Sequence, residues 1–589
     1  MKDDDCSAVE AAVLPEPATR ADDLSGTSLA AAAAAAALLA ACGGGGGGAV
    51  VADLPGSGGT APPVQATPPS EKDAARFLTQ ASFGMRSAEE VAVLQKQGFD
   101  AWLFEQFNKP TALHVAYLES QRGRDAQRGD QLRVTEEMSY EAIWQHWLHG
   151  EDQLRARMAW ALLQIMVISN IAPDIRPHAM SSYMDMLGRN AFGNFRTLLQ
   201  DVALHPAMGY YLNMLESEKE DAAKGTHPNE NFAREVLQLF SIGLVKLELD
   251  GSTRLGADNQ PIATYDEAVI KGYAQAFSGW SYGGLDNTRD ATFHDHDDNN
   301  ESYWVVPMKA WASYHSPGPK TLLDGRVLPA GQTPEKDMAD ALDSIFNHPN
   351  VGPFIGRQLI QRFTSSNPSR DHIRRVATVF NDNGAGVRGD LRAVLRAVLL
   401  DPEARGDAAA AQPRFGKARE PVQRFAATLR AMGAKSKNGL NSIHYLDSAD
   451  DSLGQSPLLA PSVFNFYAPG YRPPGPLSIA GMVAPEFQIT TETTVVGGLN
   501  FFADLLWSGG YGNGDFRLQL DFAPWEALAT DAAKLIDRID LLFFTRQMSG
   551  PTRERLTRLV NALPANDPRE RVRSALMLAA MSPDHIVQK

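Results

Sequence analysis

The stretch of sequence that decides the fold runs from residue 227 to residue 243 and reads HPNENFAREVLQLFSIG. Pro228 suits the first turn of a helix and Gly243 suits its end, so the sequence predicts a helix over residues 230–244. The apolar side of this helix is formed by Phe232, Val236, Leu239 and Phe240. We expect that side to pack into a protein interior.

The polar side of the same helix has an unusual composition. It carries Glu230, Arg234, Gln238 and Ser241 in one stripe, flanked by Asn231 and Glu235. The spacing predicts an ion pair between Glu230 and Arg234, and a hydrogen bond between Asn231 and Glu235. The stripe lacks Lys and is rich in planar groups of fixed geometry, which favours a buried network or a cleft wall over a solvated face.

The stripe allows two interpretations. In an active site, Glu230 and Glu235 would act as general acid or base, and Asn231, Arg234 and Gln238 would bind the substrate. In a structural network, the same groups would only hold helices together, because such networks also bring titratable groups close to one another.

Amphipathic patterns of helical period recur along the rest of the chain. They cover residues 154–167, 195–204, 267–277, 338–346, 351–363, 372–380, 391–400, 421–432 and 524–544. Ser87 followed by Glu90 predicts a capping box at a further helix. Strand-like alternation is scarce. We therefore expect an all-α fold, a large multi-helix body with long Gly/Pro/Asn-rich loops at residues 250–262, 281–335 and 433–485.

Composition excludes several classes of protein. Of the 589 residues, 44% are hydrophobic and 21% are charged, values typical of globular domains and not of disordered or multi-span membrane chains. The 70 acidic residues against 55 basic ones give a net charge of -15, which disfavours nucleic acid as a partner. The chain has no P-loop and no dinucleotide-binding glycine motif, so we expect no nucleotide cofactor.

The first seventy residues read as a leader and tether, and residues 71–589 as one helical body. Residues 29–41 are continuously apolar, too short to cross a bilayer, and end in Leu39-Ala40-Ala41-Cys42, which resembles a bacterial lipobox. This pattern predicts export and a lipid anchor at Cys42, in the periplasm or at the outer membrane. The acidic residues before the apolar run favour the alternative, a low-complexity tail on a cytoplasmic protein.

Three further segments have side chains suited to chemistry or binding. Residues 293–300 contain His294, His296 and Asp297, a composition that suits a divalent metal, although a solvated acidic loop has the same composition. Residues 279–283 fit the Gly-x-Ser-x-Gly pattern, but a helix is expected before them, where a nucleophile elbow needs a strand. The aromatic and Pro-rich loop 456–475 is expected either to line a ligand groove or to cap the core.

Several motifs together resemble the bacterial domain of unknown function 1800 family. The central match covers residues 230–235 and 238–243, and further matches lie at residues 77–84, 190–196, 205–209, 278–280, 366–369 and 461–467. The resemblance leads us to expect His205 and His315 among the binding residues. Many members have His-Asp before a Gly-x-Lys, whereas this chain has His315-Ser316. Because Ser316 replaces the Asp, any metal-binding or acid-base role that depends on that Asp is weakened here.

The resemblance implies an exported protein without an established activity. Members of this family often accompany a protein of the domain of unknown function 1501 family, which looks like the alkaline phosphatase and sulfatase hydrolases, so we expect a partner of that kind. The first functional hypothesis is therefore a cell-envelope module that partners an exported hydrolase. The alternatives are a hydrolase of unrecognised type acting on surface polymers through Glu230, Asn231, Arg234 and Glu235, and a purely structural protein.

Overall fold

The computed structural model describes residues 68–124, 133–171, 175–297 and 299–589. The chain divides into the units Met1–Thr60 and Ala61–Lys589, and every described residue lies in the second unit. Cys42 and the predicted leader fall outside the described residues. No helix in the described part of the chain is both long and apolar enough to span a bilayer.

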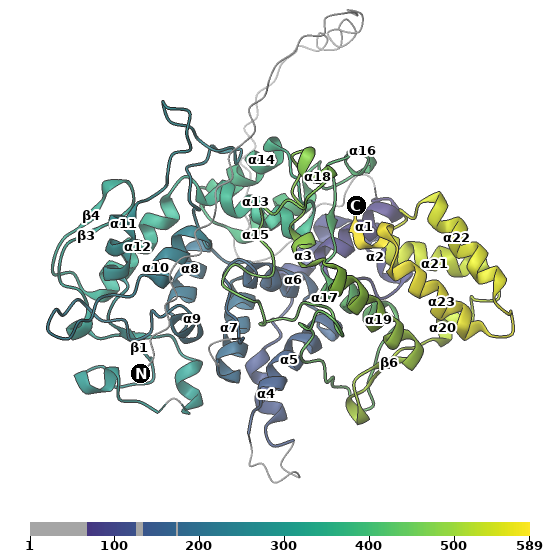
Figure 1. Cartoon of the computed structure of the whole chain (residues 1–589), viewed down its shortest axis with the longest axis horizontal. Coiled ribbons are helices and arrows are strands. Elements are labelled where there is room, and N and C mark those ends of the chain that lie inside the picture. Colours follow the sequence, from purple (N-terminus) through teal and green to yellow (C-terminus); the bar gives the residue numbers. More distant parts are fainter. Residues whose placement is uncertain (1–67, 125–132, 172–174, 298) are drawn as a thin grey trace, which may run out of the picture. The chain divides into compact units, whose positions relative to one another are not determined.

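The first half of the body contains eleven α-helices in its described residues (Figure 1). These are α1 (Glu71–Ala81), α2 (Ala88–Gln97), α3 (Phe99–Asn108), α4 (His114–Gln121), α5 (Glu136–His149), α6 (Gln153–Leu163), α7 (Pro177–Asn190), α8 (Phe195–Ala203), α9 (Pro206–Tyr211), α10 (Asn231–Gln238) and α11 (Glu267–Ala276).

The second half adds thirteen more α-helices in its described residues. These are α12 (Pro334–Asn347), α13 (Val351–Phe363), α14 (Arg370–Asn381), α15 (Leu391–Leu400), α16 (Asp407–Ala410), α17 (Pro421–Ala431), α18 (Pro476–Ile479), α19 (Glu492–Ser508), α20 (Ala523–Glu526), α21 (Ala532–Phe544), α22 (Gly550–Ala562), α23 (Pro568–Ala580) and α24 (Pro583–Ile586).

The strands of the described residues are short and form four antiparallel pairs. The pairs are β1 (Trp280–Ser281) with β2 (Lys309–Ala310), β3 (Lys320–Thr321) with β4 (Val327–Leu328), β5 (Lys417–Ala418) with β8 (Val587–Gln588), and β6 (Gly510–Tyr511) with β7 (Leu518–Gln519). The predicted all-α class is confirmed, because these pairs only fasten loops and chain ends to a helical body.

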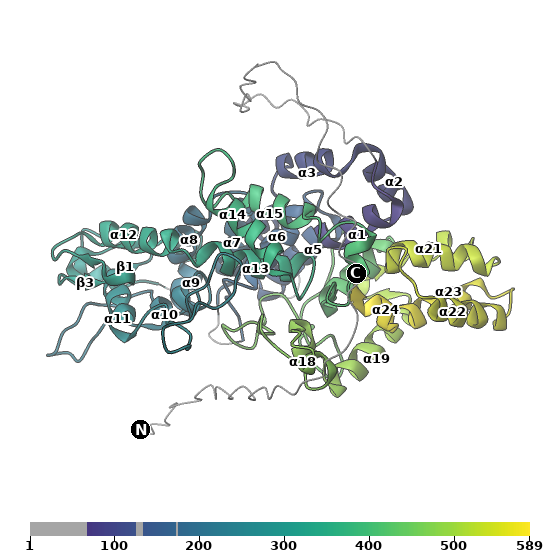
Figure 2. The ribbon, with the colours of Figure 1, turned by 90° about the horizontal axis from the view of Figure 1, so that it is seen from above.

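Tryptophans form the centre of the apolar core. Trp147 on α5 makes edge contacts with Trp144 at 5.1 Å and with Trp160 on α6 at 5.2 Å between ring centroids, and Phe83 stacks on it at 4.1 Å. Elsewhere in the body α13 packs on α14 and α15, and the C-terminal helices α21, α22 and α23 pack on one another at one end of the ribbon (Figure 2). Burial of these rings supplies a large share of the hydrophobic stabilisation.

Several local predictions were wrong in detail. Ser87 begins α2 without a side-chain capping bond, and the Glu90 carboxylate accepts a hydrogen bond from the Arg86 amide at 2.8 Å. The expected helix over residues 524–544 is two helices, α20 and α21. The expected loop 281–335 contains short strands and 3-10 turns. Its Gly and Pro residues permit tight chain reversals, but composition alone did not predict where these reversals occur.

Candidate functional site

The polar helix α10 is shorter than expected. Its last residue is Gln238, and the Ile242 and Gly243 amides then both donate to the Leu237 carbonyl at 3.0 Å. Gly243 has a φ of +74°, a conformation that favours glycine, and it lies directly against the ring of Phe354 on α13. The turn therefore joins the end of α10 to α13.

The outer part of the predicted stripe is a surface ion pair. Arg234 contacts Glu230 at 3.2 Å, as predicted, and also Glu267 at 3.7 Å. The side-chain amide of Asn231 donates to the side-chain oxygen of Asn213 at 3.2 Å, and the predicted bond between Asn231 and Glu235 is not formed. All three acid and arginine side chains are partly exposed, so solvent screens their attraction and it contributes little to stability.

Glu235, beside the surface ion pair, is buried. Its side chain is only 6% exposed, and its Oε2 has no hydrogen-bond partner in the described part of the chain. Burial raises the pKa of the Glu235 carboxyl to about 7, against a weaker opposing effect of Arg234. Burial, together with this carboxyl, also raises the pKa of Tyr211 and of Tyr265 to about 12. Glu235 is therefore a protonatable group in an apolar setting.

A cavity of about 380 Å³ opens beside the last turn of α10. Three segments far apart in sequence surround it: residues 238–253, the α13 helix, and residues 463–470 of the aromatic loop. Its apolar wall is formed by Ile165, Leu239, Ile242, Leu244, Val245, Leu247, Phe354, Val463 and Phe464. Gln238 belongs to the lining, and Glu235 does not. The loop 456–475, for which a groove or a cap was expected, contributes to the wall of a cavity.

Buried side chains hold the three segments in place. The side-chain amide of Asn350, just before α13, donates to the Ile242 and Val245 carbonyls at 2.8 Å. The side-chain oxygen of Asn350 accepts from the Leu247 backbone N–H at 2.9 Å. The Gln361 amide donates to the Pro469 carbonyl at 3.0 Å. Because these groups are buried, their bonds fix the backbone around the cavity.

The polar lining of the cavity was not predicted. Gln164, Arg357, Gln358, Arg362 and Tyr467 supply it together with Gln238 and Thr253, and no acidic residue is among the described lining residues. Arg357 and Arg362 lie on α13, whose sequence VGPFIGRQLIQRF contains two arginines and no acid. That imbalance in a buried helix is the signal that could have drawn attention to them.

The two predicted binding histidines lie elsewhere, inside the core. The His205 ring caps α9 by accepting from the Ala207 amide at 3.2 Å, and its Nε2 contacts Ser182 at 3.2 Å. Burial lowers the pKa of His205 to about 3, so its ring stays neutral. Neither His205 nor His315 lines the cavity beside α10.

His315 is part of a buried group that resembles a catalytic triad. Its Nε2 contacts Asp337 at 2.8 Å, and its Nδ1 lies 3.3 Å from the Ser278 hydroxyl. Lys320 also pairs with Asp337, at 2.7 Å. All four side chains are buried, and the Ser278 hydroxyl donates to the Gln275 carbonyl, so the group ties loops together.

The predicted metal-binding residues are only partly brought together. His294 contacts Glu216 at 3.3 Å and Glu218 at 3.1 Å, and His296 also contacts Glu216. Asp297 turns away and accepts from Asn299 at 3.0 Å. Thus two histidines share one carboxylate, Glu216, which the sequence did not indicate.

A different triad has ligand atoms at metal-binding distances among the described residues. It consists of Glu119, His178 and Glu301. The Arg122 guanidinium lies between its members, at 2.7 Å from Glu119 and 2.5 Å from Glu301. A guanidinium that already neutralises both carboxylates leaves this triad as an ion-pair cluster.

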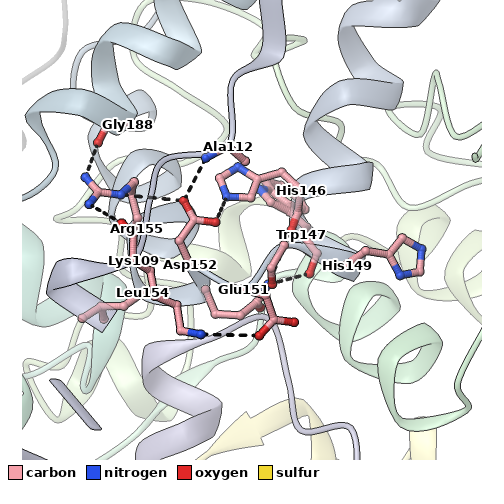
Figure 3. A network of polar contacts seen from close by, with 12 residues as sticks. Lys109, Ala112, His146, Trp147, His149, Glu151, Asp152, Leu154, Arg155 and Gly188 are labelled. Carbon is pink, nitrogen blue, oxygen red and sulfur yellow. Dashed lines mark hydrogen bonds and ion pairs between the residues drawn. The ribbon is translucent and has the colours of Figure 1, made fainter. Parts of the chain in front are cut away.

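Figure 3 shows a network of polar contacts around His146, near the C-terminal end of α5. His146 contacts Asp152 at 2.7 Å, whose other oxygen accepts from the Ala112 amide at 3.3 Å. Arg155 donates to the Gly188 carbonyl at 2.9 Å. His146 is a core residue whose ring partner is a carboxylate. The network joins α5, α6 and α7.

A family model described as "Protein of unknown function (DUF1800)" matches residues 76–587. No curated protein and no solved structure matches the chain.

The raised pKa of Glu235 predicts a pH-dependent stability. In the unfolded chain the Glu235 carboxyl releases its proton near its ordinary pKa of 4.5, whereas in the folded protein it keeps the proton until about pH 7. The carboxyl therefore lowers the free energy of unfolding progressively as the pH rises from about 4.5 to 7. We expect the difference in unfolding free energy between Glu235→Gln and wild type to rise by about 2 kcal/mol, in favour of the variant, from pH 5 to pH 8. This value allows for partial solvent screening.

Thermal unfolding of both proteins at the two pH values measures this difference. Glu230→Gln, at the start of the same helix, is the matched control, because it removes only a surface ion pair. A Glu235→Gln effect that is equal at pH 5 and pH 8 would contradict the burial of an ionisable carboxyl.

Proposed function

The chain belongs to the DUF1800 family of proteins of unknown function, and from that premise we propose that it is a cell-envelope module that binds a small ligand. The observation that carries the proposal is the cavity of about 380 Å³ between residues 238–253, α13 and residues 463–470. Ligand cavities typically occupy about 300–1,000 Å³ and combine an apolar wall with a few polar groups. This cavity has both properties.

The rim of the cavity supports a binding role. Leu244 is 56% exposed and Phe464 is 54% exposed, and both belong to the lining. Large apolar side chains at the mouth of a cavity provide contact area for an apolar ligand. The fastened backbone around them provides a preformed site, which lowers the entropic cost of binding.

The envelope location is supported by the sequence of residues 29–42. A lipid anchor at Cys42 and the Gly/Pro-rich tether that follows would hold the helical body near a membrane. The expected protein partner, of the domain of unknown function 1501 family, stays a prediction.

Hydrolysis of a surface polymer is the second candidate function. The observation that favours it is Glu235, whose pKa of about 7 suits a general acid or base near neutral pH. Glu235 lies one turn before Leu239 in the cavity wall, but it does not itself line the cavity. The binding role therefore accounts for the cavity more directly.

We expect Cys42→Ser to move the full-length protein from the membrane fraction to the soluble fraction of a bacterial host, because the lipid is attached through the cysteine sulfur. Cys6→Ser is the matched control, since Cys6 is the other cysteine of the chain. Immunoblots of the fractions and incorporation of labelled fatty acid provide the measurement. Equal membrane association of the two variants would refute the anchor.

We expect Val463→Trp to weaken binding of the neutral fluorescent probe N-phenyl-1-naphthylamine by about tenfold or more, because the larger ring occupies the cavity. Fluorescence titration measures the affinity. Val327→Trp is the control, as Val327 is an exposed strand residue outside the lining. If wild type binds no probe, or if both variants bind it equally, the cavity is not a ligand site.

The second candidate makes a separate prediction. If the protein hydrolyses cell-wall or glycan fragments, Glu235→Gln lowers kcat by about 10²–10⁴-fold while the fold is kept. Release of reducing ends or of free amines from the fragments measures the reaction. Glu248→Gln, at an exposed carboxylate, controls for loss of charge. Full activity of Glu235→Gln would exclude this carboxyl from the chemistry.

A further inference from the structure

The cavity beside α10 is positively charged, although the protein as a whole is acidic. Its charged lining residues are Arg357 and Arg362, and no Asp or Glu is among the described lining residues. The whole chain carries 70 acidic residues against 55 basic ones. A cavity with this lining is therefore an exception on an otherwise acidic molecule.

Arg362 is held by backbone oxygens instead of a carboxylate. Its Nη2 donates to the Gln164 carbonyl at 2.8 Å, and its Nε has no partner among the described residues, although the side chain is only 3% exposed. Gln164 is similarly buried, and its Oε1 also lacks a partner there. Both residues belong to the cavity lining, and each has one covered polar atom that no described residue satisfies.

Arg357 has no protein partner at all within the described part of the chain. Among the described residues, its guanidinium makes no hydrogen bond and no carboxylate lies within 4.0 Å of it. The side chain is half-buried on α13, one turn after Phe354. Burial, followed by the repulsion of Arg472, lowers the pKa of Arg357.

A half-buried cation without a counter-charge is costly, and an anion placed beside it would offset that cost. Guanidinium groups bind carboxylates and phosphates through paired N–H donors. Most of the exposed lining is apolar, with Ile165, Leu239, Leu244 and Phe464 among the apolar residues, although Gln164, Gln238, Thr253, Gln358 and Tyr467 also contribute. This mainly apolar surface suits a hydrocarbon body better than a sugar chain.

We propose that the cavity binds a small amphiphile with an acidic head group, a carboxylate or phosphate, which Arg357 holds while the apolar wall covers its hydrocarbon body. This inference rests on the proposed binding function and adds the chemical class of the ligand. The volume of about 380 Å³ suits a single short chain and not a polymer segment.

The test uses the full-length protein and displacement of bound N-phenyl-1-naphthylamine by decanoate, decyl phosphate and decanol. These competitors have the same hydrocarbon chain and differ in head group. We expect at least one acid to bind wild type about 10- to 100-fold more tightly than decanol, which is the range for a hydrogen bond to a charged group. Whichever acid shows the larger preference identifies the head group.

The variant Arg357→Gln should reduce the preference of acid over alcohol to about twofold or less, while Arg357→Lys should keep part of it. Arg555→Gln is the matched control, because Arg555 is an exposed arginine on α22, which does not contribute to the cavity. Thermal unfolding of each variant reports whether the fold is kept. The comparison of acid with alcohol in wild type needs no variant.

Each contrary result has a distinct meaning. If decanol binds wild type as tightly as both acids, the acidic head group is wrong and a neutral apolar ligand remains. If Arg357→Gln keeps the full preference, the assignment of Arg357 is wrong. If neither the probe nor any competitor binds the folded wild type, the proposed binding function fails as well.

Discussion

The body of the protein depends on one buried carboxylate, Glu420, which precedes α17. It accepts hydrogen bonds from Trp160 at 3.2 Å, Gln164 at 2.6 Å and Gln455 at 2.8 Å, and from Gln423 on its own helix. These donors are all neutral. Trp160 and Gln164 lie on and at the end of α6, Gln423 lies on α17, and Gln455 lies in the loop that leads to residues 463–470 of the cavity wall. The start of a helix also favours negative charge. Removal of this carboxylate would leave several buried donors unsatisfied at once.

The same carboxylate organises the inner wall of the cavity. Gln164 donates both to Glu420 and to the Tyr467 hydroxyl, at 3.1 Å, so its amide nitrogen is used and its oxygen is left without a partner. Its backbone carbonyl holds Arg362. Neutral donors occupy Glu420, and Arg362 is held by the Gln164 carbonyl instead of by an acid. Gln164 therefore links the buried carboxylate of the core to one arginine of the cavity wall.

The sequence predicted what depends on local periodicity and missed what depends on tertiary contact. The helices α13 and α17 were expected because their apolar residues recur every three or four positions. The ion pair of Glu230 with Arg234 was expected because it joins neighbours on one helix. The burial of Glu235 against Tyr211 and Tyr265, and the isolation of Arg357, depend on segments that meet only in the fold. Periodicity in one segment contains no information about them.

Composition was also a poor guide to which polar clusters could act on a ligand. The serine, histidine and aspartate of the Ser278 group have the residue types of a hydrolase, but each is fully paired and buried, so no substrate atom can approach them. Arg357 matches no catalytic or binding motif, yet it borders the cavity and lacks a partner among the described residues. Unsatisfied bonding capacity beside accessible space is a better criterion for a binding site than residue type, because only such a group gains free energy when a ligand arrives.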